Sequence, residues 1–355
     1  MPVEAVHLTP IDFTEIDGWQ EDDQSAALAA LLRSCRAAGT AALPPCAFAM
    51  TLGETASRDV ARAFFEAHYT PHRIGSGAEP GLVTSYYEPE FFGARTRGRR
   101  FQVPIHGHPG DLVPIAPDLE RARFNDRLTS MRQTPEGLVP YYTRAEIDGG
   151  ALSGRGLELL YLDDVVELFF MQVQGSGLVR LREGGSVRLT YVGKNGHPYT
   201  SIGKLLVERG ELASGAASMQ AVKEWLRADV ARGRRLMAEN ASYVFFRELD
   251  ADEGCDGPLG AEGVALTARR SLAVDAAVHA LGTPIYVTAP DLITPEWAPF
   301  RRLMIAQDVG SAIRGPERGD IFWGCGEAAG AIAGGTLAAA RFIVLLPKHK
   351  GTELE

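Results

Sequence analysis

The sequence predicts a mainly β protein with flanking helices, organised as two domains. At 355 residues the chain exceeds the usual size of a single hydrophobic core. Short apolar strands separated by glycine-containing turns occur near residues 81–89 and again over residues 243–346, whereas the stretch between them has its own strands and helices. We therefore expect one β-rich domain split between residues 1–106 and 243–355, with a second, smaller β-rich domain inserted at residues 107–242.

Two helices are expected ahead of the first strands. Asp22 or Asp23 opens the first helix, and Gly39 follows it as a stop signal. Ser57 caps the second helix, and Pro71 ends it. Apolar positions recur at helical spacing in both, which is typical of scaffold helices: Leu28, Leu31, Leu32 and Cys35, then Val60, Phe64, Phe65 and His68.

The inserted block has its own succession of elements. Glycine and proline interrupt the strand pattern at residues 107–114, which suits a crossing between domains. Beyond it we expect a short helix at Arg144–Ile147, several strands between Leu157 and Tyr191, a helix from Ile202 to Arg209, and a longer helix from about Met219 to Glu239.

Composition and missing motifs exclude several functional classes. The net charge of −9 and the pI near 5.5 argue against a nucleic-acid binder, which would carry a basic face. No apolar run reaches the roughly 18 residues of a membrane span, and the first residues lack the features of a signal peptide. There is no G-x-S-x-G motif, and the eight histidines show no metal-ligand spacing, so serine hydrolases and metallohydrolases are disfavoured.

The four cysteines have no CxxC spacing, which disfavours a zinc site. Cys35 and Cys46 flank a short loop and could pair in an oxidising compartment, or stay as free buried thiols. The sequence leaves both alternatives open.

Two carboxylates in short apolar strands are the strongest chemical signal. Asp308 ends one such strand and Asp320 opens the next, with Gly310, Gly315 and Gly319 between them. Aspartate is normally exposed and is rare in strands, so each of these two residues needs a reason. Each could accept backbone hydrogen bonds and hold a loop, or take part in proton transfer.

A third aspartate, Asp275, lies upstream in the segment SLAVD, and the order SLAVD, LGTPIYV, QDVGSAIRGPERGDIFWG resembles the 3D domain. Three further segments, YYEP at 86–89, MQVQGSG at 171–177 and YVGKNGHPYTSIGK at 191–204, resemble the markers of the membrane-bound lytic transglycosylase A family. Members of this family cut the glycan strands of bacterial peptidoglycan. The resemblance implies a double-psi β-barrel built from the two ends of the chain, a smaller β-rich domain between them, and a groove separating the two.

The resemblance implies that Asp320 is a single catalytic acid. It would protonate the oxygen between N-acetylmuramic acid and N-acetylglucosamine, then accept the proton of the muramoyl C6 hydroxyl, which closes a 1,6-anhydro ring. The apolar residues 321–323 would keep this carboxyl protonated by raising its pKa. Asp308 would orient the site, and Asp275 would be structural or orienting. No cofactor is expected, and the scattered aspartates lack a calcium-loop spacing, so no metal is expected either.

Polar residues of the family markers are candidates for substrate binding. Gln172 and Gln174 are interpreted as lying in a strand, on one face that Ser176 continues, and amide groups suit sugar hydroxyls. A purely structural polar ladder is the alternative. The other candidates are Tyr86 and Tyr87, of which at most one can face outward on a strand, Glu88, Lys194, Asn195, Tyr199, and Ser201, which could simply cap a helix.

Two other functions stay open at this stage. A glycoside hydrolase on a similar barrel would need a water-activating base opposite Asp320, for which Asp308 and Glu88 are the candidates. A non-catalytic glycan-binding scaffold would not need an acid in an apolar setting. The family resemblance implies a periplasmic monomer that binds glycan strands. An outer-membrane lipid anchor lying outside this sequence and a place in the cell-wall synthesis machinery are further expectations.

Overall fold

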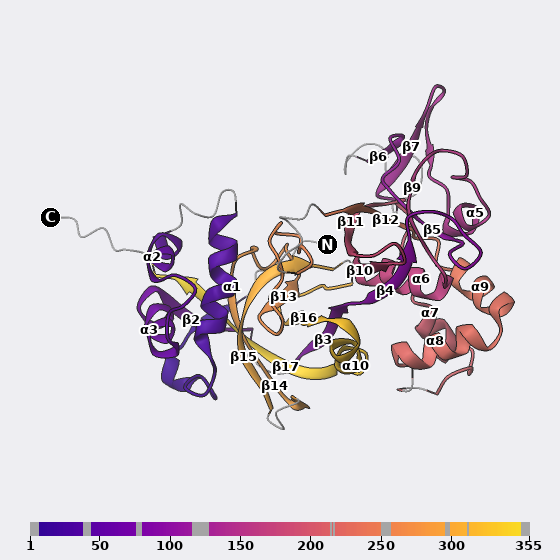
Figure 1. Ribbon diagram of the computed structural model, residues 1–355. Coiled ribbons are helices and arrows are strands. Elements are labelled where there is room, and N and C mark those ends of the chain that lie inside the picture. Colours follow the sequence, from indigo (N-terminus) through magenta and orange to yellow (C-terminus); the bar gives the residue numbers. More distant parts are fainter. Residues whose placement is uncertain are drawn as a thin grey trace. The chain divides into compact units, whose positions relative to one another are not determined.

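The computed structural model describes residues 7–37, 44–75, 80–115, 128–213, 215, 217–249, 257–294, 299–310 and 312–348. Its ribbon is drawn in Figure 1. The chain divides into two compact units: Met1–Tyr87 together with Glu253–Glu355 form one, and Glu88–Asp252 form the other. One unit is therefore split in the sequence by the other, as expected.

The split unit is built on a closed β-barrel (Figure 1). Six strands of the described chain follow one another around the ring, and an antiparallel pairing of the last with the first closes it. In ring order they are β3 (Gly81–Glu88), β16 (Arg318–Cys325), β13 (Ser271–Val274), β15 (Pro299–Val309), β14 (Pro284–Ile293) and β17 (Leu337–Pro347). Strands β2 (Tyr69–Ile74) and β1 (Leu8–Pro10) extend the sheet from β17. The predicted class, a mainly β fold around a split barrel, is confirmed.

Three helices, α1 (Gln24–Arg36), α2 (Pro44–Leu52) and α3 (Arg58–His68), pack together on the barrel. The short helix η1 (Phe13–Glu15) precedes them, and α10 (Gly326–Ala333) follows β16 and lies away from them (Figure 1). The side chain of Asp23 caps α1 through the Ser25 amide, and that of Ser57 caps α3 through the Val60 amide, which confirms both predicted helix starts. The stop predicted at Gly39 lies outside the described residues.

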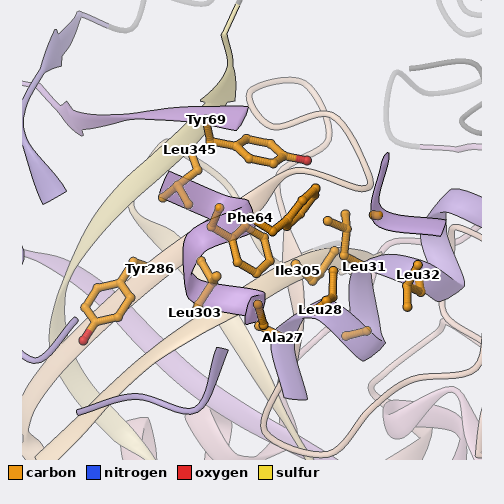
Figure 2. Packing of buried hydrophobic residues seen from close by; sticks show 14 of the residues in the cluster. Ala27, Leu28, Leu31, Leu32, Phe64, Tyr69, Tyr286, Leu303, Ile305 and Leu345 are labelled. Carbon is orange, nitrogen blue, oxygen red and sulfur yellow. The ribbon is translucent and has the colours of Figure 1, made fainter. Parts of the chain in front are cut away.

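A hydrophobic core joins these helices to the barrel (Figure 2). Leu28 and Leu31 of α1 and Phe64 of α3 lie against Leu303 and Ile305 of β15. All five side chains are at most 2% exposed, so the helices bury their apolar stripe on the barrel wall. A disulfide between Cys35 and Cys46, with 5.3 Å between the Cα atoms, links α1 to α2. Of the two alternatives for these cysteines, pairing is the one observed.

A buried ion pair fastens the chain ahead of α1 to the barrel. The guanidinium of Arg270 donates to both carboxylate oxygens of Asp22, at 2.9 and 2.8 Å, and the Leu303 amide donates to Asp22 at 2.7 Å. Both charged side chains are no more than 5% exposed. Removing one partner would leave the other charge buried and unpaired, which is far costlier than the loss of an exposed pair.

The described residues of the inserted unit form two sheets. The larger has the strand order β12 (Val244–Glu248), β11 (Ser186–Lys194), β10 (Ser176–Leu181), β4 (Glu90–Ala94), β9 (Glu158–Leu162) and β5 (Val103–His106). The smaller comprises β6 (Leu112–Pro114), β7 (Ser130–Thr134) and β8 (Gly137–Pro140). The helices are α5 (Arg144–Asp148), α6 (Val165–Gln174), α7 (Ile202–Glu208), α8 (Met219–Ala228) and α9 (Val230–Ala238).

The unit boundaries differ from those placed by sequence. Along the sequence, the boundaries fall between Tyr87 and Glu88 and between Asp252 and Glu253, rather than at 106/107 and 242/243. The difference arises because β4, β5 and β12 pair with strands of the inserted unit. Their sequences are as apolar as those of the barrel strands, so composition alone could not assign them to the inserted unit.

Two further expectations were wrong in detail. The single helix predicted from Met219 to Glu239 is two helices, because Asp229 adopts an extended conformation and caps the second through the Arg232 amide. The strand-like segment around Gln172 is the helix α6, capped by Asp164 and ended by Gly175 in the left-handed conformation. Its buried Val166, Phe169 and Phe170 pack against α7 and α8.

No described helix is long and apolar enough to cross a membrane.

We predict that Asp22→Ala lowers the free energy of unfolding by about 3–5 kcal/mol, because Arg270 then stays buried without its counter-ion. Urea unfolding monitored by tryptophan fluorescence measures the change. Arg73→Ala, which breaks an exposed pair with Glu15, is the control and should cost no more than about 0.5 kcal/mol. Equal, small losses in the two variants would contradict the role given to the Asp22–Arg270 pair.

Candidate active site

Asp320 lies in β16 and is half-buried beside β3. The Thr84 hydroxyl donates to Asp320 Oδ1 at 2.7 Å. Burial raises the pKa of the Asp320 carboxyl to about 6, and the nearby Asp308 charge acts in the same direction. The Thr84 hydrogen bond and the positive charge of Arg318 oppose this rise. Asp320 can therefore hold a proton near neutral pH and also release it.

Asp308, near the end of β15, has a different set of partners. The Tyr86 hydroxyl donates to its Oδ2 at 2.7 Å, and the Ala261 and Val309 amides each donate to its Oδ1 at 2.9 Å. Burial raises the pKa of Asp308, while these three donors lower it. The Tyr86 ring packs on Phe322, with 5.3 Å between the ring centroids, so Tyr86 joins the two acidic strands. Asp308 is thus held from three sides.

Asp275, the third aspartate, holds the loop between β15 and β16. Its Oδ2 accepts from the Gly315 amide at 2.9 Å, and its Oδ1 accepts from Arg314 Nη1 at 3.3 Å. The Gly315 hydrogen bond lowers the pKa of Asp275, so this carboxyl is ionised at neutral pH. One turn on, His279 Nε2 lies 2.7 Å from the Pro316 carbonyl oxygen. Asp275 therefore acts on the loop backbone, which is the structural alternative predicted for it.

Tyr87 and Glu88, which follow Tyr86, are both buried. The Tyr87 ring covers Gly330 so closely that a Cβ at position 330 would lie 2.6 Å from it. The Glu88 carboxylate is fully buried and accepts from Arg188 Nε at 2.9 and 3.1 Å. The sequence makes Glu88 a candidate water-activating base for a hydrolase. In the structure its carboxylate is instead engaged in an ion pair with Arg188.

Gln172 and Gln174 do not share a face, which corrects the interpretation of this segment as a strand. They lie two positions apart in α6, and about 100° per residue turns them to different sides of a helix. Gln172 is 4% exposed; its Oε1 accepts from Arg144 Nη1 at 2.6 Å, and its Nε2 donates to the Val244 carbonyl at 3.0 Å. Gln174 is half-buried at the helix end, and Ser176 is buried at the start of β10.

The K-N-G-H-P-Y segment contributes mainly to the fold of the inserted unit. Asn195 is fully buried; its Nδ2 donates to the carbonyls of Tyr142 and Ala241, both at 2.8 Å, and its Oδ1 accepts from the Tyr243 amide. Ser201 caps α7 through the Lys204 amide at 3.3 Å, as its structural alternative predicted. Lys194 ends β11 and is half-buried, and Tyr199 is 45% exposed.

Two residues around Asp320 were missed by the sequence analysis, namely Thr84 and Arg318. Thr84 lies two residues before Tyr86 in β3, and Arg318 lies two residues before Asp320 in β16. Side chains two apart on a strand share a face. Strand alternation, applied outward from Tyr86 and Asp320, could therefore have found both.

Among the described residues, no group of three or more His, Cys, Asp or Glu side chains is placed to hold a metal ion. The site therefore consists of half-buried, hydrogen-bonded carboxyl groups in the wall of a six-stranded barrel. Such an arrangement is suited to acid–base chemistry.

Comparisons with known proteins show which family the chain is similar to. Two family models match the chain, the MltA specific insert domain over residues 82–247 and the 3D domain over residues 270–346. Membrane-bound lytic murein transglycosylase A of Vibrio cholerae is 40% identical over 270 residues, which are 74% of this chain and 65% of that protein. The match thus spans slightly less than two thirds of the curated relative.

Solved structures match over nearly the whole chain. A membrane-bound lytic murein transglycosylase from Agrobacterium tumefaciens is 36% identical, with a TM-score of 0.86, covering 96% of this chain and 97% of its own. Escherichia coli MltA with bound chitohexaose is 27% identical, with a TM-score of 0.72, covering 96% and 94% respectively. The chain belongs to the membrane-bound lytic transglycosylase A family, and the predicted resemblance is confirmed.

The raised pKa of Asp320 predicts that stability falls as pH increases. An unfolded Asp titrates near about 3.9, whereas Asp320 titrates near about 6 in the folded state. Between these values the folded state binds more protons than the unfolded state, so a rise in pH favours unfolding, by up to about 3 kcal/mol once Asp320 is ionised. Asp320→Asn stays neutral and should be more stable than wild type at about pH 7.5, with the difference vanishing near about pH 4. Urea unfolding at both pH values measures this, and a difference independent of pH would contradict it.

Gln172→Ala should destabilise the inserted unit by about 1–3 kcal/mol, since Arg144 loses a charged hydrogen bond in a buried site. The neighbouring Val173, 42% exposed on the same helix, supplies the control Val173→Ala, expected within about 0.5 kcal/mol of wild type. Thermal unfolding followed by circular dichroism compares them. A Gln172→Ala protein as stable as the control would show that this amide is free for another task.

Proposed function

We propose that the protein is a peptidoglycan lytic transglycosylase. It would cleave the β-1,4 bond between N-acetylmuramic acid and N-acetylglucosamine and leave a 1,6-anhydromuramoyl end. The observation that carries the proposal is Asp320, a half-buried carboxyl whose pKa is raised to about 6 and which lies in the barrel wall beside Thr84. Family membership supports it, as does the chitohexaose bound by the E. coli relative.

In the first step the neutral Asp320 donates its proton to the glycosidic oxygen. Burial supports this role because it raises the pKa of the carboxyl and so preserves the acid form near neutral pH. The bond between the muramoyl C1 and this oxygen breaks, and the leaving sugar departs with the proton. Asp320 becomes a carboxylate, which the positive charge of Arg318 favours.

In the second step the Asp320 carboxylate accepts the proton of the muramoyl C6 hydroxyl, and the C6 oxygen bonds to C1. The acid form is thereby restored and no water is consumed. Asp308 would serve as an orienting group rather than as a second acid, because three donors fix its two oxygens. It would hold Tyr86 in place and, through its charge, favour the protonated form of Asp320.

The inserted unit would bind the glycan strand. Among the residues predicted to contact the glycan, Gln172 and Asn195 use their amide groups for hydrogen bonds within the inserted unit. They would therefore support glycan binding indirectly, by holding the fold of this unit. Tyr199 is 45% exposed and offers a ring that could stack on a sugar face. Three further predictions are untested: substrate contacts by Gln174, Ser176 and Lys194, the groove, and the monomeric state.

The membrane-bound relatives favour a location at the cell envelope, and we propose the periplasm, where glycan strands lie.

Asp320→Asn tests the proposal. It should lower turnover of purified sacculi at least about a hundredfold, because the amide keeps the shape but cannot supply a titratable proton. Asp291→Asn changes an exposed aspartate of β14 and should leave turnover unchanged.

Mass spectrometry of the products in H₂¹⁸O supplies the second measurement. We expect 1,6-anhydro ends without ¹⁸O from wild type. Reducing ends carrying ¹⁸O would indicate a hydrolase, and wild-type turnover by Asp320→Asn would assign the acid elsewhere.

A further inference from the structure

A chain of two hydrogen bonds connects Arg318 to Asp320 through Thr84. Arg318 Nη2 donates to Thr84 Oγ1 at 2.8 Å, and Thr84 Oγ1 donates to Asp320 Oδ1 at 2.7 Å. Arg318 Nη1 also donates to the Gly319 carbonyl, which anchors the guanidinium to its own strand. All three side chains are partly buried in the same unit.

The donor and acceptor properties of these groups fix the direction of both hydrogen bonds. A guanidinium can only donate, so the Thr84 oxygen must accept from Arg318. The hydroxyl keeps one proton of its own, and among the described residues Asp320 Oδ1 is the acceptor that it reaches. A proton placed on Oδ1 would have to compete with the Thr84 proton. Asp320 Oδ2, in contrast, accepts no hydrogen bond from the described residues.

We propose that Arg318 is a positioning residue that works through Thr84, committing the Thr84 hydroxyl to Asp320 Oδ1 and so leaving the transferable proton on Oδ2. This inference rests on the proposed role of Asp320 as the acid and adds which of its two oxygens performs the transfer. The same contact keeps the carboxyl from rotating, since Oδ1 stays bonded to Thr84 in both the neutral and the ionised state.

Arg318 also balances the charges around the acid. The charged or titratable groups that act on Asp320 or respond to it are Arg318, Asp308 and Tyr86. Arg318 is the cation among them, and it favours the carboxylate that must form when the proton leaves. A neutral residue at position 318 would therefore raise the pKa of Asp320 and slow the formation of the carboxylate in the first step.

The test is a double-mutant cycle of Thr84→Val, Arg318→Met and both together, assayed at about pH 5, where Asp320 is largely protonated. Each single variant should lower kcat about tenfold or more while KM stays unchanged, because the acid is misplaced and no substrate contact is lost. The double variant should be no slower than Thr84→Val alone. Thr84→Ser keeps the hydroxyl and should restore turnover, and Arg73→Met is the control for loss of an exposed arginine.

A second readout does not depend on activity. Arg318→Met should make the fall in unfolding free energy with increasing pH larger than in wild type and extend it to higher pH, because the pKa of Asp320 rises. Should Asp320→Asn prove fully active, the proposed function fails, yet this readout still decides whether Arg318 acts on Asp320. Arg318→Leu, which also has no donor for Thr84, replaces Arg318→Met, with the same expectations, if the latter does not fold.

Three results would overturn the inference. Wild-type kcat in Arg318→Met would remove its positioning role. Losses that multiply in the double variant would show that Arg318 acts independently of Thr84. A raised KM at unchanged kcat would mean that Arg318 binds substrate instead.

Discussion

The pairing of β3 with strands from the other end of the chain is the constraint on which the site depends. β3 hydrogen-bonds to β16 on one side and to β17 on the other, which closes the barrel. It thereby carries Thr84 and Tyr86 to two carboxylates more than 200 residues away in sequence, at 2.7 Å each. Without the closed ring, neither aspartate would have its side-chain donor.

Opposing electrostatic effects set the properties of Asp320. Burial favours the neutral acid, whereas Thr84 and Arg318 favour the carboxylate, and the outcome is a pKa of about 6. A fully apolar setting would raise the pKa further and hold the proton too tightly for the first step, in which Asp320 donates it. A more strongly hydrogen-bonded carboxyl, such as Asp275 with its Gly315 contact, is ionised and cannot serve as an acid. The same residue type thus has different chemistry in one barrel because the balance between burial and hydrogen-bond donors differs.

Much of this was predictable from sequence, for identifiable reasons. Helix starts at Asp23 and Ser57 follow from local capping, which depends on few residues. The assignment of the strands to units was not predictable from their composition, because it depends on long-range pairing. The alternation of Gln172 and Gln174 suggests a strand, whereas the helical spacing of the buried Val166, Phe169 and Phe170 indicates the helix that is observed. Arg318 and Thr84 needed the pairing of β3 with β16 before their contact could be recognised.

The central claim is that the barrel holds the Asp320 carboxyl as an acid near neutral pH. A ¹³C NMR titration of protein labelled at the aspartate carboxyl carbons, with Asp320→Asn used to assign the signal, measures it directly. The account predicts a midpoint of about 6 for Asp320. A midpoint at or below about 4, the value of an ordinary aspartate, would contradict it.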